Sequence, residues 1–162
     1  MTRRKHLVAQ LRAAPRPTSV VVIGSYREDL TGLLAFCRSL VQLGLRVLHP
    51  PPQATRTGEE LGFVRLNSDL SADQGQVQRH VFTLIDGCDA VILYSPEGRV
   101  GVSAALELGY ALHAHKPIYA TAWPLDVTVR VLLSYEPSAL ANFLRAAITA
   151  TELKEYAEPP PA

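Results

Sequence analysis

The chain has 162 residues, 48% of them hydrophobic, which is enough for a single domain with a substantial core. Its 16 basic and 15 acidic side chains leave a net charge of +1, so no strong electrostatic field attracts nucleic acid or an anionic membrane. No apolar run approaches the roughly 20 residues that a membrane-spanning helix requires. We therefore expect a partner that is neither a nucleic acid nor a membrane.

The two ends of the sequence differ in composition from the part between them. Residues 1–18 hold a cluster of basic side chains, and we expect a solvated basic leader there, a weak contact with a polyanion being the alternative. Residues 151–162 end in Glu158-Pro-Pro-Pro-Ala162, which cannot continue a helix, so a flexible tail is predicted. Cys37 and Cys88 lack metal-binding or redox spacing, and the start lacks a signal-peptide core. Reduced, buried thiols and a cytoplasmic location are the expectation.

The first predicted elements are a buried strand and an amphipathic helix. Residues 19–24 form a continuous β-branched apolar run ending in glycine, the pattern of a strand buried on both faces. Residues 30–43 space apolar side chains three and four apart, which predicts a helix with Gly44 as its C-cap. A short second strand over 45–48 follows. Residues 50–62 carry Pro, Gly, Gln and Thr and are predicted to form an irregular loop.

The rest of the chain continues this alternation. Residues 63–66 are predicted as a short extra strand, and Ser71 followed by Gln74 resembles a capping box that opens a helix over 72–86. Apolar patterning then predicts, in order, a core strand over 90–94, a helix over 102–114, a strand over 117–120, a fifth strand over 127–133 and a last helix over 138–150.

Strands that alternate with helices indicate an α/β fold with a doubly wound, mostly parallel sheet. We predict one domain over residues 19–150, with a five-stranded sheet in the flavodoxin-like or Rossmann-like order 2-1-3-4-5. Strands 1 and 3 are then neighbours, and ligands bind where the carboxyl ends of such strands meet. The loops after Gly24 and Tyr94 are therefore expected to form the site.

The loop after the first strand reads Gly24-Ser25-Tyr26-Arg27. Glycine allows close backbone approach, serine offers a hydroxyl, and arginine offers a planar cationic fork beside the N-terminus of the next helix. These features predict a phosphate cradle, the alternative being an ordinary turn with a solvated Arg27. A dinucleotide cofactor is not indicated, because the segment has one glycine and no acid placed to hold a ribose.

Glu107 is the isolated acid of a second segment. It follows a flexible loop over 95–103 that contains Gly101, and it shares one helical stripe with Ser103, Tyr110 and His113. Because the helix dipole favours an anion near the start of a helix, we expect a lowered pKa and an ionised carboxylate suited to nucleophilic attack. The alternative is that this stripe is the polar, solvated face of the helix.

Several segments occur in the same order in one known family: Gly24-Ser-Tyr-Arg27, Asp89-Ala-Val-Ile-Leu93, the Gly/Ser loop, Glu107-Leu-Gly-Tyr-Ala111 and Lys116-Pro-Ile-Tyr119. Over residues 19–121 the chain resembles the nucleoside 2-deoxyribosyltransferase family, including its deoxynucleoside 5′-monophosphate N-glycosidase branch. The resemblance implies that Glu107 attacks the anomeric carbon of a sugar. It also implies a substrate-binding set made of Gly24, Ser25, Tyr26, Arg27, Gly101, Ser103 and Tyr110, with the Gly24–Arg27 turn on the 5′-phosphate.

The activity implied by this resemblance is cleavage of the N-glycosidic bond of a nucleotide or nucleoside, with hydrolysis of a 5′-monophosphate favoured over base exchange. No metal and no cofactor is expected. The family carries aspartates where this chain has Gly101 and Val81, so another group must protonate the departing base. The candidates for that acid are Asp69, Asp86 and His80.

Two alternatives remain open on the sequence alone. A non-catalytic module could keep the pocket to bind or sense a nucleotide, and an unrelated small ligand could use the same fold. The resembling family completes its sites across a homodimer. Apolar side chains over 77–84 and 106–112 exceed what one sheet face needs, so a homodimer or dimer-based oligomer is predicted.

Overall fold

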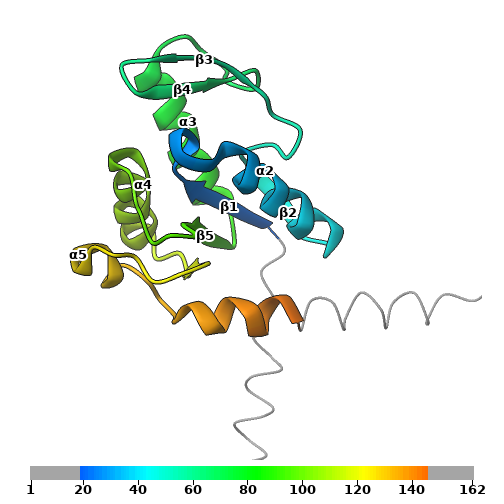
Figure 1. Cartoon of the computed structure of the whole chain (residues 1–162), viewed down its shortest axis with the longest axis vertical. Coiled ribbons are helices and arrows are strands. Elements are labelled where there is room, and N and C mark those ends of the chain that lie inside the picture. The colour runs from blue at the N-terminus through cyan, green and yellow to red at the C-terminus, as the bar shows by residue number, and fades with distance from the viewer. Residues whose placement is uncertain (1–18, 146–162) are drawn as a thin grey trace, which may run out of the picture.

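The computed structural model describes residues 19–145 and contains a four-stranded parallel sheet. β1 and β5 lie side by side at its centre, and Gly24 pairs with Tyr94, so both strands end at the same level (Figure 1). This order matches the first four strands of the predicted Rossmann- or flavodoxin-like order 2-1-3-4-5, and the predicted fifth strand is absent from this sheet. Across the sheet the strands are β2 (Arg46–His49), β1 (Ser19–Gly24), β5 (Ala90–Tyr94) and β6 (Ile118–Ala120).

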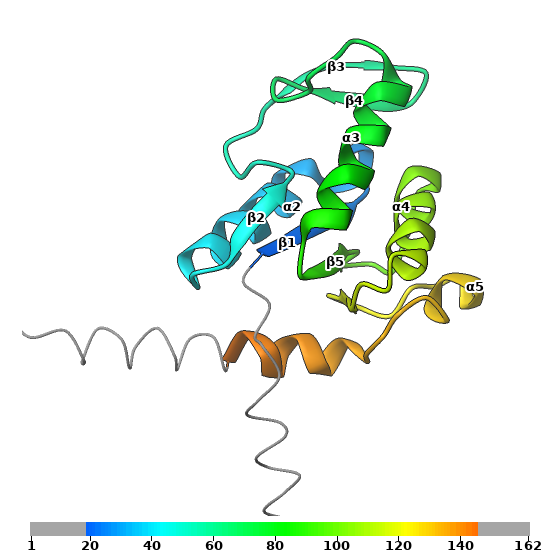
Figure 2. The same cartoon turned by 180° about the vertical axis from the view of Figure 1, so that it is seen from behind.

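Helices cover both faces of the sheet. Val20 and Val22 point to one face and Val21 and Ile23 to the other, and all four are essentially inaccessible to solvent. Burial of a side chain of this size contributes about 1.5–3 kcal/mol, which explains why both faces need cover. The first face packs against α2 (Tyr26–Gln42) and the helical residues 137–145, and the second against α3 (Gln74–Gly87), α4 (Val102–His113) and α5 (Val127–Arg130) (Figures 1 and 2).

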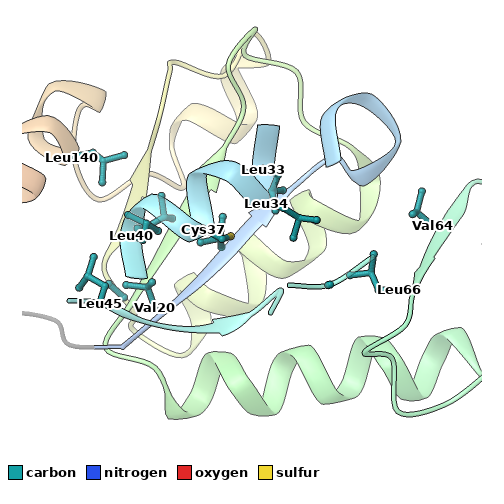
Figure 3. Packing of buried hydrophobic residues seen from close by; sticks show 13 residues of the cluster. Val20, Leu33, Leu34, Cys37, Leu40, Leu45, Val64, Leu66 and Leu140 are labelled. Carbon is teal, nitrogen blue, oxygen red and sulfur yellow. The ribbon is translucent and has the colours of Figure 1, made fainter. Parts of the chain in front are cut away.

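A small hairpin stands apart from the main sheet. β3 (Arg56–Glu60) pairs antiparallel with β4 (Phe63–Leu66), and the turn places Leu61 and Gly62 at φ 51° and 84°. Positive φ at both turn residues matches the right-handed twist of a hairpin. Val64 and Leu66 anchor the hairpin in the core on the α2 side, and Figure 3 shows them at the opposite end of that core from Leu140.

Two sequence predictions for these segments are wrong. Residues 56–60, predicted as irregular loop, form β3; the strand is polar and exposed, so it lacks the apolar alternation that marks a half-buried strand. The fifth strand over 127–133 does not form. Asp126 caps the short helix α5 by accepting from the backbone N–H of Thr128 at 2.7 Å, and Ser134 bonds the free edge of β6 at Ile118.

The helix starts also need correction. α2 begins at Tyr26, before the predicted residue 30, and Asp29 interrupts it with non-helical dihedral angles. The carboxylate of Asp29 accepts from the backbone N–H of Gly32 at 2.8 Å, so it caps the longer second part of the helix. Asp73, and not Ser71, caps α3 by accepting from Gln76 N at 2.8 Å, while the Ser71 hydroxyl accepts from Asp73 N.

Other predictions are confirmed within residues 19–145. The helix and strand at 102–113 and 118–120 lie within a residue of their predicted bounds, and Cys37 and Cys88 are buried free thiols on opposite faces of the sheet. No helix in this described part is long and apolar enough to cross a membrane. The leader over 1–18, the tail over 151–162 and the end of the last predicted helix lie outside the described residues.

Candidate functional site

A pocket of about 690 Å³ opens at the carboxyl end of β1. Its walls come from the loop after β1, the end of β2, the tip of the hairpin, one face of α3 and the first two turns of α4. Pockets of 300–1,000 Å³ hold most small ligands and cofactors. The position of this pocket agrees with the rule that open α/β sheets bind ligands beyond the carboxyl ends of their strands.

The pocket brings together nearly all of the site residues predicted from the sequence. Its lining includes Gly24, Ser25, Tyr26, Arg27, Gly101, Ser103 and Glu107. Tyr110 is not among the lining residues. Its hydroxyl donates to Asp86 Oδ2 at 2.8 Å, and its ring stacks on Phe82 with the ring centroids 4.3 Å apart. Tyr110 therefore ties α4 to α3, one turn beyond Glu107 and outside the pocket.

Glu107 is a partly buried carboxyl in the pocket wall. Gln78 on α3 donates from Nε2 to Glu107 Oε1 at 2.8 Å. Burial raises the pKa of Glu107 from 4.5 to about 7, and the hydrogen bond from Gln78 opposes only part of that rise. The sequence expectation of a lowered pKa is therefore wrong. Loss of water around the second turn of α4 outweighs the helix dipole, which acts over the first turn.

A tyrosine–histidine pair lies in the same pocket. The Tyr26 hydroxyl and Nε2 of His49 are 2.7 Å apart. Burial, and then the proximity of His80, lower the pKa of His49 to about 4, so this ring is neutral at pH 7. Burial, and then the negative charge of Glu107, raise the pKa of Tyr26 well above 10. Both groups are therefore uncharged hydrogen-bonding partners beside the carboxyl.

Two helix N-termini line the pocket, and this part of its wall is called the anion-binding end below. α2 starts after Ser25 with one turn, which ends where Asp29 interrupts the helix, and α4 starts after Gly101; among the described residues neither of these two starts has a side-chain cap. The starts of α3 and α5 are capped by Asp73 and Asp126. Uncapped N–H groups at a helix start carry partial positive charge and bind anions. This end of the pocket is therefore suited to a phosphate or carboxylate.

Arg27 adds a full positive charge there, although it is already paired. Its Nε lies 3.4 Å from Oε1 of Glu59 on β3, and 64% of its side chain is exposed. Gly24 has a packing role instead of a ligand-approach role. A Cβ atom at this residue would lie 2.6 Å from Leu33 Cδ1 and 2.7 Å from the carbonyl oxygen of Tyr94, so the crossing of β1, α2 and β5 requires glycine.

The loop after β5 contributes less to this pocket than predicted. Only its last residues, at 101 and beyond, reach the wall that contains Glu107. Residues 94–97 and Arg99 line a separate cavity of about 410 Å³, which shares Ser25 and Glu28 with the larger pocket. The buried hydroxyl of Ser95 in this second cavity has no hydrogen-bond partner in the described structure.

Of the three candidate acids, only one lines the pocket. Asp69 lines the pocket and accepts from the backbone N–H of Leu66 through Oδ2 at 2.9 Å. Asp86 is exposed and bonded to Tyr110, and neither it nor His80 lines the pocket. Within residues 19–145, no three His, Cys, Asp or Glu side chains are grouped so that they could hold a metal ion.

Two pocket residues, His49 and Gln78, were not predicted from the sequence. His49 stands at the carboxyl end of β2, next to β1, where a polar residue is a candidate ligand contact. Gln78 belongs to a stripe on α3 with residues spaced three and four apart, and its polar members could have been read as pocket-facing. That stripe is Gln74, Val77, Gln78 and Val81.

The sequence matches no protein-family model, and no curated protein is significantly similar to it. The structure itself defines an α/β protein with a Rossmann- or flavodoxin-like parallel sheet of order 2-1-5-6 and a separate antiparallel hairpin. The pocket at the carboxyl end of β1 joins a carboxyl of raised pKa to an end suited to anions. This combination is the starting point for a functional proposal.

Proposed function

We propose that this protein cleaves the N-glycosidic bond of a nucleotide or nucleoside, with hydrolysis of a 5′-monophosphate favoured over base exchange. The observation that carries the proposal is Glu107, a carboxyl held by Gln78 in a pocket that also contains an anion-binding end and apolar side chains. A strongly shifted pKa in a cleft is typical of a functional group. The sequence resemblance to nucleoside 2-deoxyribosyltransferases points to the same residue.

The chemistry proceeds in two displacements. Ionised Glu107 attacks C1′ of the sugar and forms a C–O bond, while the C1′–N bond breaks and its electron pair leaves with the base. The base takes up a proton as it departs. Water then attacks C1′, gives a proton to solvent, and returns the Glu107 carboxylate with release of the sugar. A second base in place of water would give transfer.

The pocket walls support this orientation of a nucleotide. The phosphate lies against the uncapped starts of α2 and α4, with Ser25, Arg27 and Ser103 nearby. The sugar then lies over Glu107, and the base lies against Phe63, Val77 and Val81. Aromatic and aliphatic side chains suit the flat faces of a base. Gln74, on the same stripe of α3, offers an amide to the edge of that base.

Asp69 is the proposed acid for the departing base. It is the one candidate among Asp69, Asp86 and His80 that lines the pocket, and its Oδ1 is not used by the hydrogen bond from Leu66. Tyr110 has no place in this mechanism, because it bonds Asp86 outside the pocket. The neutral Tyr26–His49 pair lines the same pocket as Glu107 and offers uncharged hydrogen-bonding groups to the sugar.

Replacing Arg27 by alanine should weaken binding of a 5′-monophosphate by about tenfold or more, because a charge-assisted contact is worth roughly 1.5–3 kcal/mol. The affinity for the matching nucleoside, which lacks the phosphate, should stay unchanged. Isothermal titration calorimetry on both ligands measures the difference. Arg38→Ala, on the same helix and outside the pocket, is the control. Equal monophosphate affinity of wild type and Arg27→Ala would reject the assignment.

A non-catalytic nucleotide-binding module is the second candidate, favoured by the glycine and valine at positions 101 and 81. Such a module would bind monophosphates without changing them. Calorimetry and chromatography on the same samples separate the two functions. Binding together with release of free base supports the enzyme, and binding with intact nucleotide supports the module.

We also propose a C2 homodimer or dimer-based assembly in which the partner covers the open side of the pocket. Val77 and Val81 on α3 are buried within the chain. They are therefore not available for the subunit interface that was predicted to include this helix. On α4, Val102 and Leu106 are 89% and 56% exposed and flank the pocket residues Ser103 and Glu107. Exposed apolar side chains beside a site are typical of an interface.

Light scattering at micromolar concentration should therefore give a mass that is a multiple of 17.7 kDa. A Leu106→Glu variant should shift that mass to the monomer, because a charge in an apolar interface is not solvated. Leu70→Glu changes an equally apolar, exposed position away from α4 and should leave the mass unaltered. A wild-type mass of 17.7 kDa would overturn the proposed assembly.

A further inference from the structure

We propose that Glu59 holds Arg27 in the ligand-free protein and releases it to the phosphate of an incoming nucleotide, so that the hairpin sets the affinity for phosphorylated ligands. This inference rests on the proposed function, because it takes the anion at the starts of α2 and α4 to be a nucleotide phosphate. It concerns a residue outside the pocket lining, on the polar strand β3.

The position of the Arg27 side chain is set by the hairpin. Its Nε lies 3.4 Å from Glu59 Oε1, and its Nη1 lies next to Gly62 in the hairpin turn. A Cβ atom at Gly62 would lie 3.2 Å from Nη1 of Arg27, so the turn leaves just enough room for the arginine. Arg27 also belongs to the pocket wall, together with Ser25. The same side chain thus stands between Glu59 and the anion-binding end.

The exchange leaves no charge without a partner. Glu59 accepts a second ion pair from Nη2 of Arg56, on its own strand, through its other carboxylate oxygen. When Arg27 turns to a phosphate, Glu59 keeps this pair with Arg56. The arginine gains a dianion that its planar fork can bind with two hydrogen bonds.

The side chain moves in this exchange, and the hairpin stays in place. Val64 and Leu66 are buried in the α2-side core, so β4 fixes the hairpin to the sheet domain (Figure 3). Arg27 has 64% of its side chain exposed and little packing to lose. Rotation of an exposed side chain takes picoseconds to nanoseconds, so the exchange adds no slow step to binding.

Glu59 therefore lowers the affinity for phosphorylated ligands by competing with the phosphate for the Arg27 guanidinium. Exposed ion pairs of this kind are worth 0.2–1 kcal/mol, so removing the pair should tighten monophosphate binding by about 1.4- to fivefold. Salt screens exposed charges, and the gain should shrink as ionic strength rises.

The experiment compares Glu59→Gln with wild type by calorimetry on the full chain. The probes are the four common 2′-deoxynucleoside 5′-monophosphates and their phosphate-free nucleosides, at low and at high salt. Glu60→Gln is the matched control, because Glu60 lies on the same strand but pairs with Arg65 at 2.9 Å. We expect tighter binding of monophosphates by Glu59→Gln alone, no change for nucleosides, and no gain when Arg27→Ala is combined with Glu59→Gln.

The outcomes separate this inference from the function on which it rests. Monophosphate binding that is unchanged or weaker in Glu59→Gln would overturn the exchange and leave the proposed function standing. A gain that persists in the double variant would also overturn it, since Arg27 could not be the group released. If neither wild type nor Glu59→Gln binds any of the monophosphates, the proposed function and the exchange fail together.

Discussion

Replacing Glu107 by glutamine should lower the rate of base release by at least about a thousandfold, since loss of a nucleophile removes the covalent route altogether. The amide has the size of the carboxyl, and its oxygen can still accept from Gln78 Nε2, now 2.8 Å from Glu107 Oε1. It cannot donate an electron pair to C1′ as a carboxylate does. The rate is measured at saturating nucleotide by chromatography of the free base.

A matched control distinguishes the loss of the nucleophile from the loss of one negative charge. Glu97 lies in the loop after β5, outside the larger pocket and paired with Arg99, so Glu97→Gln removes one negative charge without touching the site. Its rate should equal that of wild type. The assignment of Glu107 fails if Glu107→Gln, still folded by circular dichroism, turns over substrate within a few-fold of wild type.

Glu107→Gln should also make the fold more stable at pH 8, by up to about 3 kcal/mol. Burial raises the pKa of the native carboxyl from 4.5 to about 7, so the native state favours the protonated form. Wild-type stability from this group is fully present below pH 4.5 and is lost as pH rises through 7. Glutamine never ionises and escapes that loss.

Chemical denaturation with urea at pH 4 and at pH 8 measures the effect. The stability difference between Glu107→Gln and wild type should be near zero at pH 4 and reach its full size above pH 7. A loss of folding stability of this kind is common where a functional site requires a charged side chain that is partly buried. A difference of the same size at both pH values would show that burial does not set the pKa of Glu107.

The central sheet could be predicted from the sequence because its elements carry strong local patterns. β1 and β5 are continuous apolar runs, and α4 begins at the residue that the pattern gave, Val102. Once two parallel strands are adjacent, the rule for open sheets places the site beyond their carboxyl ends. That rule predicted that Ser25, Ser103 and Glu107 share one site, and all three line the same pocket.

The features of the fold and site that could not be predicted from the sequence depend on contacts between distant residues, which no local pattern encodes. Gln78 and Glu107 are 29 positions apart and meet only because α3 packs against α4. The raised pKa of Glu107 follows from burial by those helices, whereas its place near a helix start pointed the other way. β3 forms although it is polar and exposed, because β4 is anchored in the core and the Leu61–Gly62 turn folds the chain back onto it.

Release of free base by the wild-type protein tests the central claim most directly. The protein is incubated at pH 8, where about nine-tenths of a group with a pKa of 7 is ionised, with deoxynucleosides, ribonucleosides and their 5′-monophosphates. We predict that at least one 5′-monophosphate yields free base and sugar 5-phosphate, without inorganic phosphate, and that Glu107→Gln yields neither product. Absence of free base from every compound, or equal release by Glu107→Gln, would contradict the account.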